Sequence, residues 1–358
     1  MKFSITVQTK IDDWKVYKEI EELGYDAAWL PDTQMVWSDC YATMALAAHT
    51  TSRIRLGTGV SIAGTRLAPV TAHSIASINQ IAPGRVFIGI GTGHTAMRVM
   101  GMDPMRVEDF REYLRVLRAL LHGEAVDYTL NGVTRTIDFI HKDLGFRNTE
   151  QPVPIYVAAN GPRALAAAGE HGDGLIAAFN EDPDALAYHL GMVKAGAEAS
   201  GRTLPEDFYT STLTNAAVLR PGETATSDRV IENCGAWTVA ILHFVYEIYR
   251  YTKNEEMIPE YFHGVWEEYC DHVEKMDVPA DQRHLKIHDG HCTFYPPDER
   301  RFITEETLRG VCMVGEPAEI ADRLHKAEAA GLHEFSMLPS ISGLRETMRD
   351  FTEVMKIY

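Results

Sequence analysis

Residues 54–93 decide the fold, and they read IRLGTGVSIAGTRLAPVTAHSIASINQIAPGRVFIGIGTG. Ile54–Val60 is a short apolar run that predicts a strand. Pro69–Ile81 predicts a helix with proline in its first turn, and Val86–Ile90 predicts a second strand. A strand, a helix and a strand in this order are typical of a parallel sheet with a crossover helix.

The same alternation extends in both directions from this stretch. Further strands are expected at Lys2–Gln8, Asp26–Leu30, Pro154–Ala158, Gly174–Ala178, Phe208–Leu219 and Glu334–Leu338. Helices are expected at Asp12–Leu23, Asp39–Thr50, Met105–Leu121, Pro162–His171, Pro183–Ala199, Glu316–Ala330 and Leu344–Lys356. Eight strands with intervening helices predict an α/β fold, a (β/α)8 TIM barrel, as a single domain over residues 1–358. The alternative is an open doubly wound sheet, but no Gly-x-Gly-x-x-Gly turn follows the first strand.

Two segments interrupt the alternation. Val126–Phe139 contains Asn131-Gly132 between strand-like runs, which predicts a hairpin on the barrel rim. Residues 223–304 are rich in aromatic residues and helix formers, for example in Trp237–Tyr251 and Glu255–Met276. We interpret this second segment as a helical insertion, or lid, after the seventh strand.

Charge and cysteine content limit the possible partners. A net charge of −17 disfavours binding to nucleic-acid phosphates. No stretch approaches the roughly 20 apolar residues of a membrane span, and the first residues lack the apolar run of a signal peptide. The five cysteines are scattered, without a Cys-x-x-Cys pair, which is typical of a reducing compartment. We therefore expect a cytoplasmic protein without nucleic-acid or membrane partners.

Small and polar residues gather where the predicted strands end, and in a barrel of this type chemistry occurs at these carboxyl ends. The candidates are Asp32 and Thr33, then Gly59, Val60 and Ser61, then Thr92, Gly93 and His94, then Ala159, Asn160, Gly161 and Arg163, and finally Ala177–Asn180. Small residues allow a flat ring to approach the backbone, and backbone N–H and threonine hydroxyl groups can bind its polar edge.

The end of the fifth strand is the best candidate phosphate site. Asn160-Gly161 leads into a helix with Pro162 in its first turn, and Arg163 adds a charged donor. A simple turn followed by a helix start would explain this stretch alone. Together with Gly91-Thr92-Gly93, however, it favours a cofactor site.

Two further groups admit alternatives. Asp32 is either a cap for the helix that begins near Asp39 or a buried acid at the barrel mouth, where burial would raise its pKa. His288-Asp289-Gly290-His291-Cys292 resembles a metal site at first sight, but its spacing fits no zinc module, so we predict no metal. His291 then belongs either to a lid loop over the barrel or to a surface loop.

Five segments carry a family resemblance: Ile54–Val60, Gly84–Gly93, Pro154–Pro162, Gly172–Gly174 and Val314–Pro317. In their order and spacing they resemble the luciferase-like monooxygenase superfamily. That group includes bacterial luciferases, flavin-dependent monooxygenases and enzymes that use the deazaflavin coenzyme F420, and the methylenetetrahydromethanopterin reductase branch is nearest.

The resemblance implies where a cofactor would bind. The flavin or deazaflavin ring would lie across the ends of the second to fourth strands, near Thr92, Gly93 and His94, with a non-proline cis peptide at Gly59–Val60. Asn160, Gly161 and Arg163 would hold its phosphate. The sequence departs from the pattern in two places. It has Thr33 where many coenzyme F420 enzymes have His, and His94 where the sugar-phosphate dehydrogenases have Glu.

Three functions follow from these residues and the resemblance. The sequence favours a reduced-FMN-dependent monooxygenase of a small organic substrate, with Asp32, His94 or His291 handling protons. The alternatives are a coenzyme F420-dependent reductase or dehydrogenase and a non-catalytic flavin-binding subunit. The resemblance also implies a homodimer and, for the first function, a flavin reductase that supplies reduced cofactor.

Overall fold

The computed structural model describes residues 1–178 and 183–358. The chain divides into two compact units, Met1–Thr212 with Ala327–Phe335, and Leu213–Lys326 with Ser336–Tyr358. The prediction of a single domain over residues 1–358 is not tested by this division and stays a prediction. Phe179 and Asn180, expected at the end of the sixth strand, lie outside the described residues. Every helix that the structure describes is too short or too polar to span a bilayer.

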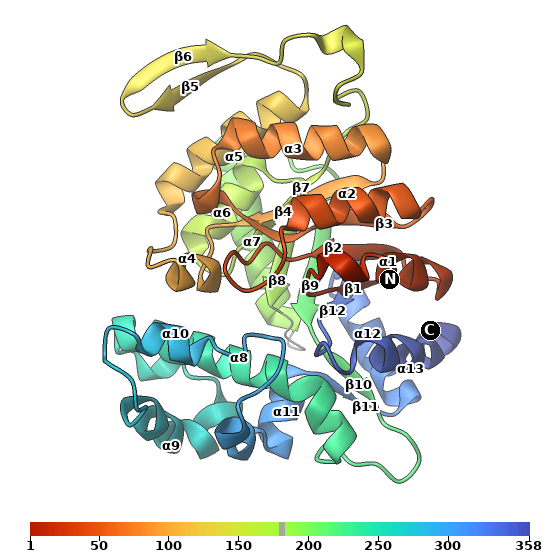
Figure 1. The fold of residues 1–358 in the computed structure, drawn as a ribbon, viewed down its shortest axis with the longest axis vertical. Coiled ribbons are helices and arrows are strands. Elements are labelled where there is room, and N and C mark those ends of the chain that lie inside the picture. Colours follow the sequence, from red (N-terminus) through yellow and green to blue (C-terminus); the bar gives the residue numbers. More distant parts are fainter. Residues whose placement is uncertain (179–182) are drawn as a thin grey trace. The chain divides into compact units, whose positions relative to one another are not determined.

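Within residues 1–178 and 183–358, eight strands close into a barrel in the order β1-β12-β9-β8-β7-β4-β3-β2 (Figure 1). They are β1 (Lys2–Thr6), β2 (Ala27–Leu30), β3 (Arg55–Ile62), β4 (Val86–Gly91), β7 (Ile155–Ala158), β8 (Gly174–Ala178), β9 (Tyr209–Thr214) and β12 (Glu334–Met337). The neighbouring pairs β1–β2, β2–β3, β3–β4, β4–β7 and β7–β8 are parallel. The strands are almost wholly buried, which is typical of a parallel barrel covered by helices. The predicted TIM barrel is confirmed.

Helices follow the strands largely where the sequence predicts them. They are α1 (Val16–Glu22), α2 (Cys40–Thr50), α3 (Ala68–Ile81), α5 (Val107–Leu121), α6 (Pro162–His171), α7 (Pro183–Ala199), α12 (Pro317–Ala329) and α13 (Leu344–Ile357). In α5, Phe110, Leu114, Leu117 and Leu121 are buried at helical spacing, which explains why this helix packs on the barrel. A short helix that the sequence did not indicate, α4 (Thr95–Val99), follows β4.

The predicted hairpin is present as β5 (Val126–Leu130) and β6 (Val133–Ile137), an antiparallel pair drawn in yellow in Figure 1. The turn residues Asn131 and Gly132 both have positive φ, 51° and 76°. A two-residue turn of this kind matches the twist of antiparallel strands, and Asn-Gly tolerates it best.

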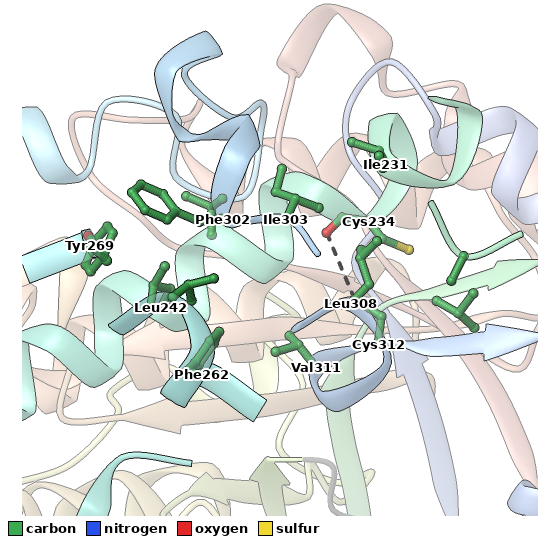
Figure 2. Packing of buried hydrophobic residues seen from close by; sticks show 14 of the residues in the cluster. Ile231, Cys234, Leu242, Phe262, Tyr269, Phe302, Ile303, Leu308, Val311 and Cys312 are labelled. Atoms are coloured by element: carbon green, nitrogen blue, oxygen red, sulfur yellow. Dashed lines mark hydrogen bonds between the residues drawn. The ribbon is translucent and has the colours of Figure 1, made fainter. Parts of the chain in front are cut away.

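The second unit has its own helical core. It contains α8 (Asp228–Thr252), α9 (His263–Glu274), α10 (Arg283–Ile287) and α11 (Glu305–Val311). Figure 2 shows side chains of this core, among them Leu242, Phe262, Tyr269, Phe302 and Leu308, and all five are essentially inaccessible to solvent. Residues 223–304 are therefore helical as predicted, and their role as a lid stays a prediction.

One predicted strand is wrong in its extent, and one stretch rich in helix formers is helical only in part. Within Glu255–Met276 the α-helix begins at His263, after two short 3-10 turns, because Pro259 lacks the N–H that a continuous helix needs. The strand expected at Phe208–Leu219 divides at Asn215 into β9 and β10 (Ala216–Val218), and β10 pairs with β11 (Met313–Gly315) outside the barrel. The Asn215 side chain accepts the Ala216 N–H at 2.8 Å, which accompanies the break.

Candidate active site

The barrel brings most of the predicted site residues to one rim. Asp32 and Thr33 follow β2, Gly59, Val60 and Ser61 lie in β3, Thr92, Gly93 and His94 follow β4, and Ala159, Asn160, Gly161 and Arg163 follow β7. β2, β3, β4 and β7 are successive neighbours in the barrel. Because parallel strands end at the same edge, these residues all lie at the carboxyl ends of the barrel strands in the first unit. Their roles stay predictions.

The third strand carries an irregularity at this rim. Its register with β4 shifts between Thr58 and Ser61, and the expected cis peptide is present at Gly59–Val60. A Cβ atom on Gly59 would lie 2.7 Å from Trp29 Cβ, so β3 passes too close to the Trp29 side chain for any residue but glycine. The Thr58 hydroxyl donates to the Gly89 carbonyl at 2.7 Å, which ties the irregular segment to β4.

Asp32 is a buried acid, which resolves one of the alternatives left open by the sequence. The cap of α2 is instead Asp39, whose carboxylate accepts the Ala42 N–H at 2.8 Å. Only 3% of Asp32 is exposed, and its carboxylate accepts from Arg66 Nη1 at 2.8 Å and from Gln34 Nε2 at 2.5 Å. Burial raises the pKa of Asp32, although the Arg66 guanidinium opposes that shift.

Arg66 is a further residue of this site, to which the sequence assigned no role. Its second terminal nitrogen, Nη2, donates to Asp39 at 2.7 Å, and its guanidinium lies 4.5 Å from the centre of the Tyr41 ring. The Tyr41 hydroxyl in turn forms a short hydrogen bond with Ser61. The sequence signal that could have identified Arg66 is its position shortly after a buried strand, on the rim that also carries Asp32.

The end of β4 combines a tight turn with a half-buried histidine. Gly93 has a φ of 78°, and an added Cβ would lie 2.4 Å from Ile62 Cγ2. Only glycine combines this conformation with so close a contact. Thr92 and His94 are half-buried. His94 immediately precedes α4, and its carbonyl accepts the Arg98 N–H at 3.0 Å.

The start of α6 is open to solvent. Asn160, Gly161 and Arg163 are exposed, and a Cβ added to Gly161 would meet no atom within 4 Å. Pro162 has no N–H, so the first amides of the helix are those of Arg163 and Ala164, and such amides have no partner inside a helix. Arg163 binds Glu108 at 3.1 Å, but both side chains are largely exposed, so this ion pair is weak. A phosphate group therefore fits this corner.

His291 belongs to the second unit, and its expected place over the barrel stays a prediction. Its side chain is half-buried, and its ring centre lies 5.8 Å from that of His288. His288 Nε2 itself lies 3.3 Å from the Glu247 carboxylate.

A parallel barrel with glycine and threonine at adjacent strand ends, a buried acid and an open helix start is typical of enzymes that bind a planar, phosphate-bearing cofactor. The model of the luciferase-like monooxygenase family matches residues 14–334. The chain therefore belongs to this family. Membership confirms the resemblance drawn from the sequence motifs and, at the level of the family, the prediction of an enzyme.

Several relatives are similar to this chain. The 5,10-methylenetetrahydromethanopterin reductase of Methanolobus tindarius is 34% identical over 52% of this chain and 55% of its own length. The F420-dependent glucose-6-phosphate dehydrogenase of Kineococcus radiotolerans is 36% identical over 54% of this chain and 60% of its own. The chain thus matches less than two thirds of the length of these curated relatives.

Among solved structures, the coenzyme F420-dependent tetrahydromethanopterin reductase of Methanopyrus kandleri superposes over 100% of this chain and 99% of its own. The TM-score is 0.69 at 20% sequence identity. At this identity the likeness concerns the fold alone.

Proposed function

We propose that this chain is an oxidoreductase that uses coenzyme F420 to transfer hydride to or from a small organic substrate. The observation that carries the proposal is the 36% identity to a relative named as an F420-dependent dehydrogenase. The sequence alone favoured a reduced-FMN monooxygenase, and the relatives shift the preference to the alternative. The homodimer stays a prediction, and the flavin reductase partner belongs to the FMN alternative.

The residues at the carboxyl rim suit such a cofactor. When bound, coenzyme F420 supplies a two-electron hydride donor or acceptor that does not activate O2. The amides of Arg163 and Ala164 would bind its phosphate at the positive end of the α6 dipole. A Cβ on Gly91 would lie 3.4 Å from Ala158 Cβ, so the ends of β4 and β7 offer a floor of small residues to a planar ring.

We assign proton transfer to His94 and a positioning role to Asp32. Both Asp32 carboxylate oxygens are occupied, one by Arg66 and the other by Gln34. Asp32 is thus placed to hold Arg66 in position beside the irregular segment of β3. His94 is half-buried next to the β4 turn, and an imidazole exchanges protons near neutral pH. In the oxidation of an alcohol, His94 would accept the hydroxyl proton, and bound coenzyme F420 would supply the hydride acceptor.

The departures from the family pattern bear on the substrate. His94 stands where the resemblance expects a glutamate in sugar-phosphate dehydrogenases, and Thr33 stands where it expects a histidine. We therefore propose a small organic alcohol or carbonyl compound rather than a sugar phosphate.

Equilibrium titration with coenzyme F420 and with FMN, each oxidised and reduced, tests the proposal. We expect micromolar binding of coenzyme F420 and binding of FMN at least about tenfold weaker. Selective binding of FMN, with O2 consumption when reduced FMN is supplied, would instead establish the monooxygenase. Binding of neither cofactor would refute both enzymatic functions.

A second measurement tests the role of His94. In single-turnover reactions with bound coenzyme F420, His94→Gln should slow hydride transfer by about 10²-fold or more, while the affinity for the cofactor stays within about twofold. An unchanged rate would show that another group carries the proton.

A further inference from the structure

The amino ends of the barrel strands border an open cavity of about 1050 Å3, formed by residues of the first unit. Its walls include Lys2 in β1, Arg55 in β3 and Tyr209 in β9, with Pro154 just before β7 and His333 just before β12. These residues lie at the ends of the strands opposite to the candidate active site, so the cavity is not part of it. Its volume is in the range of small-molecule sites.

Two arginines on the cavity wall share one carboxylate. Arg118 Nη1 lies 2.8 Å and Arg202 Nη2 3.3 Å from the same oxygen of Asp173, Oδ1. The second oxygen of Asp173 accepts the Ile155 N–H at 3.0 Å. The guanidinium groups also donate to backbone carbonyls, Arg118 to His171 at 3.0 Å and Arg202 to Gly169 and Gly172 at 3.0 and 2.6 Å. Carbonyls carry no net charge, and a single carboxylate cannot neutralise two guanidinium groups, so one positive charge remains. Both arginine side chains keep about a quarter of their surface accessible, at 27% and 20%.

A neighbouring histidine is sensitive to this excess charge. Burial lowers the pKa of His171 to about 4, helped by Arg118 and Arg202 and then by Arg115 and Arg111. A cationic field at this place is notable because the chain as a whole carries a net charge of −17. The amino end of the barrel is thus a local positive region on an acidic protein.

The floor of the cavity is aromatic. The Arg55 guanidinium lies over the rings of Phe87 and Tyr156, at 4.9 and 5.7 Å, and buried Glu334 partly offsets its charge. The Tyr156 and Tyr209 rings stack with centres 4.9 Å apart. Tyr209 also stacks on His333, with ring centres 5.6 Å apart, and only 4% of Tyr156 is exposed. The pair therefore offers the cavity a small apolar edge beside the cationic side chains.

The remaining charges lie at the cavity mouth. Lys2 is exposed, and its ammonium lies 5.7 Å from the centre of the Tyr209 ring. Glu328 binds the amino group of Met1. Asp207 is an exposed carboxylate on the same wall. Substitutions of Lys2 and Asp207 can therefore change the field of the cavity from its exposed edge without disturbing a buried ion pair.

We propose that this cavity binds a small phosphate-bearing metabolite. Arg118, Arg202 and Lys2 surround its phosphate groups, because guanidinium groups match phosphate oxygens in geometry and charge. The edge of the Tyr156 and Tyr209 pair contacts its organic part. The site is remote from the carboxyl rim and does not depend on the function proposed above.

Calorimetric titration of the full chain with inorganic pyrophosphate and with ADP tests the proposal. The purification tag is placed at the carboxyl terminus because Met1 lines the cavity. We expect saturable binding of both probes, with ADP the tighter one. Equal affinities would overturn the contact with the aromatic pair. No saturable binding of either probe at millimolar concentration would overturn the whole site.

Charge variants test whether the affinity for pyrophosphate changes in the direction that a cationic site predicts. Lys2→Glu should weaken binding of pyrophosphate about tenfold, and Asp207→Asn should strengthen it about threefold, as screened Coulomb interactions over several ångströms predict. Lys194→Glu, on an exposed face of α7 and not on the cavity wall, is the matched control and should leave the affinity unchanged. If Lys194→Glu weakened binding as much as Lys2→Glu, the binding would be non-specific electrostatic attraction and the proposed site would be wrong.

A buried-wall variant completes the test. Arg118→Gln removes one of the two guanidiniums and should abolish measurable binding of pyrophosphate. Near-ultraviolet circular dichroism checks that the variant is folded. If it is not folded, Lys2→Glu and Asp207→Asn still decide the proposal. A folded Arg118→Gln protein with unchanged affinity would overturn it.

Discussion

The barrel interior near its amino end and the carboxyl rim of the barrel use their polar groups in opposite ways. At the amino end, buried Glu334 accepts hydrogen bonds from four donors, the side chains of Ser4, Trp29, Tyr209 and Ser211. At the carboxyl end, α6 begins with exposed amides, and the adjoining strand ends carry glycine and threonine. Glu334 and its donors are thus paired with one another inside the barrel and stabilise the fold, whereas Lys2, Arg118 and Arg202 of the cavity wall are not part of this network. The carboxyl rim keeps donors available for a ligand.

Substitution of Glu334 should have the largest effect. Glu334→Leu removes the shared acceptor of four donors, of which Trp29 Nε1 keeps a second acceptor, Ser4 Oγ at 3.2 Å. We expect a loss of about 4 kcal/mol in the free energy of unfolding. Chemical denaturation measures this loss. Glu334→Gln keeps an acceptor oxygen and should cost less than half as much. If the leucine variant were as stable as the parent protein, this hydrogen-bond network would not stabilise the barrel.

Glu21 provides a second, pH-dependent test of the amino end. Burial favours its neutral form, but Lys18 and the N–H groups of Arg53, Ile54 and Ser52 outweigh burial and lower its pKa from 4.5 to about 2. Because the folded protein holds this proton less tightly than the unfolded chain, the stabilisation exists above pH 4.5 and is lost as the pH falls towards 2.

We therefore expect Glu21→Gln to lower the free energy of unfolding by about 2 kcal/mol at neutral pH. The difference from the parent protein should shrink as the pH falls below 4.5. Denaturation at a series of pH values measures it. A difference that stays constant from neutral pH down to pH 3 would contradict the lowered pKa.

At the carboxyl rim, Gly161→Asp should change binding and not stability. Aspartate is a favourable helix cap, so α6 should not be weakened. Its negative charge would oppose the cofactor phosphate, and we expect about tenfold weaker binding of coenzyme F420. Gly161→Asn is the matched neutral variant and should bind within about twofold of the parent protein. Equal affinities of the two variants would mean that the phosphate binds elsewhere.

Arg163→Gln should have the smallest effect. The side chain is 73% exposed and already pairs with Glu108, so it must leave that partner to reach a phosphate. We expect at most about threefold weaker binding of coenzyme F420, and this difference should fade in about 0.5 M salt because exposed charges are screened. A loss greater than tenfold would make Arg163 the main anion ligand instead of the amides of α6.

The fold could be predicted from local patterns because each strand and the helix that follows it are encoded in a short stretch of sequence. Residues 54–93 contain strand, helix and strand in one continuous run, and Asn131-Gly132 carries its turn conformation within two residues. The composition and spacing did not locate the breaks at single residues, the start of α9 after Pro259 and the division of the predicted strand Phe208–Leu219 at Asn215. Those residues act through one missing or competing hydrogen bond, which a periodicity over ten residues does not register.

The sequence by itself determined the alternation of strands and helices and the small residues that end four neighbouring strands. Only the tertiary structure decided which distant groups meet. Arg66 reaches Asp32 from 34 positions away, and Glu334 meets Ser4 from 330 positions away. Parallel strands bring together residues that the chain separates by whole helices, and closure of the barrel joins its first strand to its last. Hydrophobic spacing indicates which face of a helix or strand is buried, but not which side chain of another element packs against that face.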